Sequence, residues 1–433
     1  MEKERELYLT NVTVVDPEES MPVVNYGYVH IKNNYIHAFA EGEPPHTNGA
    51  EVRDCSGCCV MPGLVNTHGH SAMTLLRGYS DDLELKRWLR EAIWPAEAKF
   101  DRDITSTGSK LAMAEMIRSG TTTFMDMYHL HINDVAEQVK QIGLRACLAR
   151  GMIGMGAKEE LAEKRTEAVE LAKNWRGAAE GRLEAALFPH APYTCPPSFL
   201  EDVAADAASE AIPLQIHLAE SRQEVSDHYK DYGRPLISHM KELGILRPST
   251  MIVHGVHVTE EDISTFRDAG VSLSHNPVSN LKLGSGIAPL AKYMKQGVPV
   301  SLGTDSAASN NTLDLFEEIR LTALLHKGVA EDASVVSGKE VLQMATANGA
   351  AMLGFSNTGK MKRGQLADLI VLEQQGLHLQ PENNLLSHLV YSASGQDVRD
   401  VFVNGRCIMR NRELLTIDEE RLRYDVKEQV NKF

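Results

Sequence analysis

The middle of the chain alternates apolar, β-type runs with amphipathic helical stretches, and this alternation limits the possible folds more than any other feature. It is typical of βα units joined into a parallel sheet. Eight runs qualify as strands, which is the number that closes a (β/α)8 barrel. They are Val60–Thr67, Thr121–Met127, Arg145–Ile153, Leu183–Phe188, Ile212–Ile216, Thr250–Val253, Val271–Ser274 and Pro299–Leu302.

Both ends of the chain are β-rich instead. Residues 7–40 alternate apolar and polar side chains, and so do Ala367–Leu372 and Val398–Ile408, the latter with an Asn-Gly hairpin signal. A length of 433 residues allows a barrel of about 250 residues and a smaller unit. We therefore expect an α/β fold in which residues 60–359 form a TIM-like barrel. Residues 1–59 and 360–433 are expected to build a small, discontinuous β-sandwich domain.

Composition excludes several classes of protein. The chain has 44 basic and 59 acidic residues, a net charge of -15, and no Lys/Arg cluster suited to a phosphate backbone, so nucleic acid is not an expected partner. No run approaches the ~18 apolar residues of a membrane span, and the first residues are charged where a signal peptide needs an apolar core. We expect a cytoplasmic protein that binds a small molecule, either as a monomer or as a homo-oligomer.

Six cysteines are too few for a disulfide framework in a chain of this length, which favours a reducing compartment. Cys55 and Cys58 form a C-x-x-C pair that could indicate a zinc knuckle or a redox pair. No second C-x-x-C follows. The sequence therefore disfavours thiol chemistry.

Ligand-type side chains follow several of the predicted strands, at the end where barrel enzymes place their chemistry. The first strand runs into His68 and His70, and residues two apart on an extended chain face the same side. Repetition of this pattern after later strands predicts a metal site. The residues concerned are His190, His217 with Glu220 three positions on, His254 and Asp305.

A second H-x-H motif, His129 and His131, lies beyond the strand end predicted at Met127. We interpret it as a solvated loop pair.

The segments PGLVNTHGH, HLAES, HGVH, SHNPVSNLKLGSG and LGTDS resemble the amidohydrolase superfamily, and the resemblance covers nearly the whole chain. Together with WLREAIWPAE and PHAPYTCPP, they most resemble its subgroup of 5′-methylthioadenosine/S-adenosylhomocysteine deaminases. Related guanine deaminases and triazine hydrolases share much of this set. In the segment SNLKLGSG, Ser279, Asn280, Gly284 and Gly286 are expected to shape a loop over the site.

The resemblance implies a metal ion held by His68, His70, His217 and Asp305. Three imidazoles and a carboxylate suit Zn²⁺, and Fe²⁺ is also compatible. Many relatives bridge two metals with a carboxylated lysine at the end of strand four. This chain has His190 in that region and no lysine, so one ion per subunit is expected.

The activity implied is hydrolytic conversion of an adenine ring to hypoxanthine and ammonia, by attack of metal-bound hydroxide at C6. Asp305 would accept the proton of the water. Glu220 would carry protons to ring N1 and to the leaving ammonia, and His254 would orient the nucleophile. Both carboxylates would also contact the substrate.

Four further residues are assigned to substrate binding. The resemblance implies that Glu97 binds the ribose hydroxyls and that His190 contacts the purine or the sugar. Trp88, with Trp94 nearby, could cover the base. The guanidinium of Arg150 suits the carboxylate of an amino-acid tail.

Two alternatives stay open. One is another amidohydrolase reaction, such as guanine or cytosine deamination, triazine dechlorination or cyclic-amide hydrolysis. The other belongs to a different class, a non-catalytic barrel that serves as an assembly module.

Overall fold

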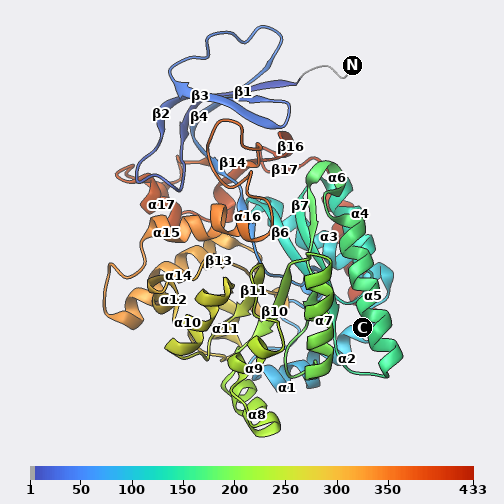
Figure 1. Cartoon of the computed structure of the whole chain (residues 1–433). Helices are drawn as coiled ribbons and strands as arrows, with labels where there is room; N and C mark the ends of the chain where they lie inside the picture. The colour runs from blue at the N-terminus through green and yellow to red at the C-terminus, as the bar shows by residue number, and fades with distance from the viewer. Residues whose placement is uncertain (1–4) are drawn as a thin grey trace.

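A ring of parallel strands forms the centre of the molecule (Figure 1). The computed structural model describes residues 5–433, so the first four residues of the predicted terminal domain lie outside it. Each of the eight predicted runs overlaps a strand of this ring. The strands are β5 (Leu64–Asn66), β6 (Thr121–Tyr128), β7 (Arg145–Met152), β8 (Leu183–Ala185), β9 (Phe188–Pro189), β10 (Leu214–Leu218), β11 (Thr250–His254), β12 (Ser272–His275) and β13 (Val300–Leu302).

The backbone pairing of the parallel strands gives a curled sheet of the TIM-barrel type. Strands β5-β6-β7-β8 form one parallel series and β10-β11-β12-β13 another, while the short β9 pairs with β7. A bridge between Leu187 and Leu214 joins the two series. On the other side, the Thr67 amide donates to the Leu302 carbonyl at 2.9 Å, which links the end of β5 to β13.

The boundary of the first predicted strand was wrong. Residues 60–62 belong to the long strand β4 (Glu51–Pro62), where Val60 pairs with Val371, and the barrel strand starts only at Leu64. Gly63 separates the two, and a Cβ there would lie 2.2 Å from the side chain of Thr122. The chain therefore passes from one sheet to the other at a point where only glycine fits.

Segments from both termini build a second, mixed sheet, which lies at one end of the molecule (Figure 1). Its order is β17-β16-β15-β14-β4-β1-β2-β3, and all its neighbours are antiparallel except β1 and β4. Its apolar side chains form a core of their own. The strands other than β4 are β1 (Glu6–Val14), β2 (Val24–Lys32), β3 (Tyr35–Glu41), β14 (Leu369–Glu373), β15 (Val398–Val403), β16 (Arg406–Arg410) and β17 (Glu413–Leu414).

Helices surround the barrel, and the largest apolar cluster lies between them and the strands. The sequence predicts helices over Ile104–Ser119 and Glu159–Trp175, and α3 and α5 cover these ranges with ends that differ by at most two residues. The longer helices are α3 (Arg102–Arg118), α4 (Ile132–Ile142), α5 (Lys158–Trp175), α7 (Pro197–Ser209), α8 (Arg222–Tyr232), α10 (Glu260–Ala269), α14 (Leu315–Ala330) and α18 (Glu419–Val430). The shorter segments are η1 (Ser71–Leu76), α1 (Leu85–Arg87), the π-helical η2 (Trp88–Ile93), α2 (Trp94–Glu97), α6 (Ala178–Gly181), α9 (Leu236–Glu242), α11 (Pro277–Lys282), α12 (Leu290–Lys295), α13 (Ala307–Asn310), α15 (Gly338–Gln343), η3 (Met344–Asn348), α16 (Gly349–Met352), η4 (Leu377–Leu379), α17 (Leu385–Tyr391) and η5 (Gly395–Asp397).

Within residues 5–433, no helix combines the length and the apolar character needed to cross a bilayer. The C-x-x-C thiols are buried in the terminal sheet, and burial raises the pKa of both Cys55 and Cys58. Thiols that stay protonated are poor nucleophiles and poor metal ligands. The structure thus supports the sequence argument against thiol chemistry.

Candidate metal and catalytic site

Imidazoles and a carboxylate from separate strands meet at one point of the barrel. His68 and His70 follow β5, His217 lies in β10, and Asp305 follows β13. One carboxylate oxygen of Asp305 lies 3.3 Å from Nε2 of His68 and 3.2 Å from Nε2 of His70. Nε2 of His217 lies 3.2 Å from Nε2 of His68. The four predicted metal ligands are therefore neighbours.

Three of the separations between these donors are close to the donor spacing of a tetrahedral metal. Ligand atoms at about 2.0–2.1 Å from Zn²⁺, at tetrahedral angles, lie about 3.3–3.4 Å from one another. The three measured separations between donor atoms are 3.2, 3.2 and 3.3 Å. His254 also belongs to the cluster, because one ring nitrogen of each of His68, His217 and His254 lies within 4.8 Å of the other two. The residues present fit a single divalent ion.

Hydrogen bonds and burial leave the imidazole donors free for a metal. The Nδ1 atoms of His70 and His217 donate to the carbonyls of Met127 and His190, each at 2.8 Å, so that Nε2 carries the lone pair in both rings. Burial lowers the pKa of His68 to about 4 and that of His217 well below its ordinary value. Both rings are thus neutral at physiological pH, as a metal ligand must be.

Hydrogen bonds from neighbouring serines hold the carboxylate of Asp305. Its Oδ2 accepts hydrogen bonds from the hydroxyls of Ser279 at 2.6 Å and Ser309 at 3.0 Å, and its Oδ1 accepts the amide of Ser306 at 2.8 Å. Although burial raises the carboxyl pKa, the neighbouring imidazoles lower it well below the usual range. The residue has φ of 61°, a left-handed conformation that is uncommon outside glycine. The surrounding contacts therefore hold an ionised carboxylate at a fixed position.

Glu220 lies beside His254, with 3.7 Å between its Oε2 and the Nε2 of the ring. The glutamate is 3% exposed, and burial raises its carboxyl pKa. His254 donates from Nδ1 to the side-chain oxygen of Asn280 at 2.8 Å, which leaves its Nε2 as an acceptor. A buried carboxyl with a raised pKa, next to a metal-type cluster, is suited to proton transfer.

Sequence reasoning missed Glu224, four residues beyond Glu220. Its carboxylate accepts the backbone amides of Ala219 at 3.1 Å and Glu220 at 2.8 Å, and it is buried. It therefore orients the segment that carries Glu220. The spacing Glu-x-x-x-Glu, with Ser221 as the N-cap of α8, is a local signal that could have indicated this contact.

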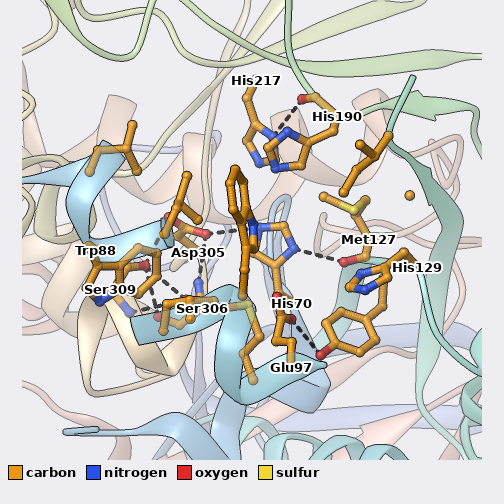
Figure 2. A pocket seen from close by; sticks show the side chains of 18 of the residues that line it. His70, Trp88, Glu97, Met127, His129, His190, His217, Asp305, Ser306 and Ser309 are labelled. Carbon is orange, nitrogen blue, oxygen red and sulfur yellow. Dashed lines mark hydrogen bonds and ion pairs between the residues drawn. The ribbon is translucent and has the colours of Figure 1, made fainter. Parts of the chain in front are cut away.

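A cavity of about 370 Å³ opens from the cluster, a volume typical of small-molecule sites. Figure 2 shows Trp88, Glu97, His190 and the ligand-type residues around it. Glu97 is 8% exposed and accepts the hydroxyl of Tyr128 at 2.6 Å. His190 borders the cavity at the end of β9, and burial lowers its pKa to about 3. The predicted substrate contacts Glu97, His190 and Trp88 are thus gathered at one cavity.

Two other expectations differ from the structure. His129 is not a solvated loop residue: it lines the cavity, and burial lowers its pKa to about 4. Strand β6 extends to Tyr128, so His129 is the first residue past a strand, in the pattern of the other site histidines. Arg150, in contrast, is outside the cavity lining, and its Nε pairs with Glu167 of α5.

A parallel barrel with imidazole and carboxylate donors at its strand ends defines a metal-dependent barrel protein. Residues 59–408 match the model of the amidohydrolase family, and the chain belongs to that family.

The relatives reported below are all named as deaminases of adenosine or its derivatives. The chain is 45% identical to a 5-methylthioadenosine/S-adenosylhomocysteine deaminase of Shouchella clausii, with 98% of each chain covered. It is 44% identical to a 5′-deoxyadenosine deaminase of Methanosarcina acetivorans, with 88% of each chain covered. Among solved structures, an adenosine deaminase from Xanthomonas campestris with bound zinc has a TM-score of 0.93 and 33% identity, covering 99% of this chain and 98% of its own.

Proposed function

We propose that this protein is a metal-dependent deaminase that hydrolyses the adenine amino group of 5′-methylthioadenosine and S-adenosylhomocysteine, releasing ammonia and leaving hypoxanthine. The observation that carries the proposal is the position of Glu220, a buried carboxyl beside a metal-type cluster and inside a nucleoside-sized cavity. Deamination of an aromatic ring needs such a group because the ring nitrogen must gain a proton as water adds. Relatives named for this activity support the same substrate class.

The proposed metal is one Zn²⁺ per subunit, bound by His68, His70, His217 and Asp305, with Fe²⁺ as the alternative. When bound, the ion lowers the pKa of water so that hydroxide becomes available at neutral pH. The donor separations of 3.2–3.3 Å and the neutral state of the buried His68 and His217 rings support this assignment.

The protein's own groups supply the proton transfers. Asp305 accepts a proton as water oxygen bonds to C6 of the ring, and Glu220 donates one to N1. As the bond between C6 and the amino nitrogen breaks, the now ionised Glu220 takes the proton of the C6 hydroxyl and delivers it to the departing ammonia. Asp305 then returns its proton to Glu220, so that both carboxyls regain their starting states. His254 orients the attacking water through Nε2, because Asn280 accepts its Nδ1 proton.

The remaining contacts select the nucleoside. Glu97 would bind the ribose hydroxyls, since Tyr128 occupies only its Oε1 atom. Trp88 would cover the base, and its indole nitrogen already donates to the Ser80 carbonyl at 3.1 Å. His190 would contact the purine or the sugar. Arg150 is the proposed partner of an amino-acid carboxylate, after it leaves Glu167.

We further infer a division into two domains, a closed barrel over residues 60–359 and a β-sandwich from residues 1–59 and 360–433. The mixed sheet with its separate core supports this division, although β4 extends it to Pro62. A cytoplasmic location accords with the charged composition. A homo-oligomer is tested by light scattering of the purified protein.

The test is ammonia release by zinc-loaded protein given methylthioadenosine, adenosylhomocysteine, adenosine and guanine separately. We expect turnover of the thio-nucleosides with the absorbance change from adenine to hypoxanthine. Turnover of guanine alone would replace the proposal with guanine deamination. Protein that binds metal but releases no ammonia from any of the four would refute adenine deamination, and protein that binds no metal would favour an assembly module.

Two variants test the roles of individual residues. Glu220→Gln is expected to keep stoichiometric metal and to lose about 10²–10⁴-fold in kcat, the range typical of a missing general acid–base. His217→Ala is expected to lose both metal and activity. Full activity of the Gln variant would contradict the proton-transfer role.

A further inference from the structure

We propose that this site prefers adenine nucleosides with a small, uncharged 5′-substituent over those that carry an amino acid, and that Glu167 enforces this preference by holding Arg150 away from the cavity. The inference rests on the proposed deaminase function and adds a substrate ranking and a specificity-determining residue to it.

The charge of the cavity lining is the first observation. It contains the carboxylates Glu97, Glu220 and Asp305 and, among residues 5–433, neither a lysine nor an arginine. His129 and His190 also line it; burial lowers the pKa of His129 to about 4, and Nδ1 of His190 is hydrogen-bonded to the Thr194 hydroxyl at 3.0 Å. A substrate carboxylate would therefore meet no lysine or arginine in the lining. Arg150 and Lys164, whose charges act on His129, lie outside it, and Lys164 donates to the carbonyls of Ile153 and Met155. Removing a carboxylate from water without a partner is strongly unfavourable.

The apolar part of the lining is the second observation. Leu130 follows β6, Ile153 and Met155 follow β7, and all three border the cavity. Their side chains can contact a methylthio or methyl group without desolvating a charge. Thioether and aliphatic groups adapt well to such surfaces.

The orientation of Arg150 is the third observation. Successive residues of a strand point to opposite faces. In β7, Cys147 and Ala149 belong to the apolar cluster inside the barrel, whereas Leu148 belongs to the cluster between strands and helices. Arg150 shares the parity of Leu148 and therefore points toward the helical layer.

Arg150 is also engaged by protein groups there. Its Nε pairs with the carboxylate of Glu167 on α5, and one terminal nitrogen donates to the Gly151 carbonyl at 2.9 Å. The Arg150 side chain is 14% exposed and that of Glu167 57% exposed. To reach an amino-acid tail, the guanidinium must leave this ion pair. An ion pair with one exposed partner contributes little free energy, so breaking the pair with Glu167 should weaken the binding of an amino-acid tail by Arg150 by about two- to fivefold.

The experiment compares kcat/KM for three substrates on the zinc-loaded, full-length protein. They are methylthioadenosine, adenosylhomocysteine, and 5′-deoxy-5′-(3-aminopropylthio)adenosine, which keeps the ammonium of the tail and lacks its carboxylate. We expect methylthioadenosine to exceed adenosylhomocysteine by about tenfold or more, the size of a missing charge-assisted hydrogen bond. The aminopropyl compound should recover much of the difference.

Equal or faster turnover of adenosylhomocysteine would overturn the inference, as would an aminopropyl compound that is no better than adenosylhomocysteine. Absence of turnover with all three would instead reject the deaminase function, so the two failures are distinguishable.

A matched pair of variants on α5 tests the role of Glu167. Glu167→Gln is expected to raise the kcat/KM ratio of adenosylhomocysteine to methylthioadenosine two- to fivefold. Glu170→Gln removes the same charge from an exposed position on the same helix, where the glutamate forms no ion pair with any of residues 5–433, and should leave the ratio unchanged. Adding Arg150→Met to Glu167→Gln should cancel the gain. An unchanged ratio in Glu167→Gln, with native circular dichroism, would show that Glu167 does not control specificity.

Discussion

The buried ion pair between Arg145 and Asp368 joins the barrel to the terminal sheet, and its removal should strongly destabilise the protein. Arg145 starts β7 and is 0% exposed, while Asp368 precedes β14 and is 2% exposed. Two parallel hydrogen bonds connect them, at 2.6 and 3.1 Å. Asp368 also accepts the amide of Asn404 at 2.7 Å. One carboxylate thus neutralises a buried cation and satisfies a buried backbone amide.

Asp368→Ala leaves the guanidinium buried without a counter-charge, a situation that costs about 3–5 kcal/mol of unfolding free energy. Among the described residues, the Gly181 carbonyl, 2.8 Å from Nη1, would be the one remaining hydrogen-bond partner of the Arg145 guanidinium. Arg145→Met combined with Asp368→Leu removes both charges and should be less destabilised than Asp368→Ala, because apolar groups of similar volume can replace such a pair.

The assay is urea unfolding of the metal-loaded protein at pH 7.5, followed by circular dichroism. Asp425→Ala serves as the control because it removes an exposed pair with Arg421 on α18, four residues apart, for which about 0.3–0.5 kcal/mol is expected. A loss of less than about 1 kcal/mol for Asp368→Ala, or a double variant worse than the single one, would refute the reasoning from burial.

Three further predictions concern the site and its surroundings. Glu318 accepts hydrogen bonds from the Val278 amide and the Asn310 side chain, and so joins the two loops that hold Asp305. Glu318→Ala should therefore lower kcat more than it changes KM, and Glu318→Gln should retain part of the lost kcat in steady-state assays. Burial lowers the pKa of His228 to about 4. As the pH falls from 6.5 to 4, the unfolded chain therefore takes up a proton at His228 that the folded chain does not, and the free energy of unfolding should fall by up to about 3 kcal/mol. His228→Asn should show a smaller fall when unfolding by urea is measured across this pH range. Chelation should abolish ammonia release and lower the melting temperature, and stoichiometric Zn²⁺ should restore both.

Strand positions were predictable because the information is local. Runs of apolar, β-branched residues between helical stretches identify barrel strands, and polar residues just after them stand at the same edge of the sheet. This reasoning predicted that His68, His217 and Asp305 lie together, and in the structure Nε2 of His68 is 3.2 Å from His217 and 3.3 Å from Asp305. It failed at His129 because the strand end was set one residue early.

Contacts between distant segments were not predictable in the same way. The division at Gly63 depends on the close approach of Thr122, and the pairing of β4 with β14 joins residues about 310 positions apart. Arg150 could be assigned to the substrate from its chemistry alone. Strand parity and the partner on α5 decide where its side chain points.

The sequence by itself determined the kind of fold and the set of metal-type ligands, because periodicity and residue chemistry are properties of short segments. Only the tertiary structure decided how those ligands are held and which neighbours tune them. The hydrogen bond from Ser279 to Asp305 and the ion pair of Arg150 with Glu167 arise from packing, because each joins two different elements of the fold.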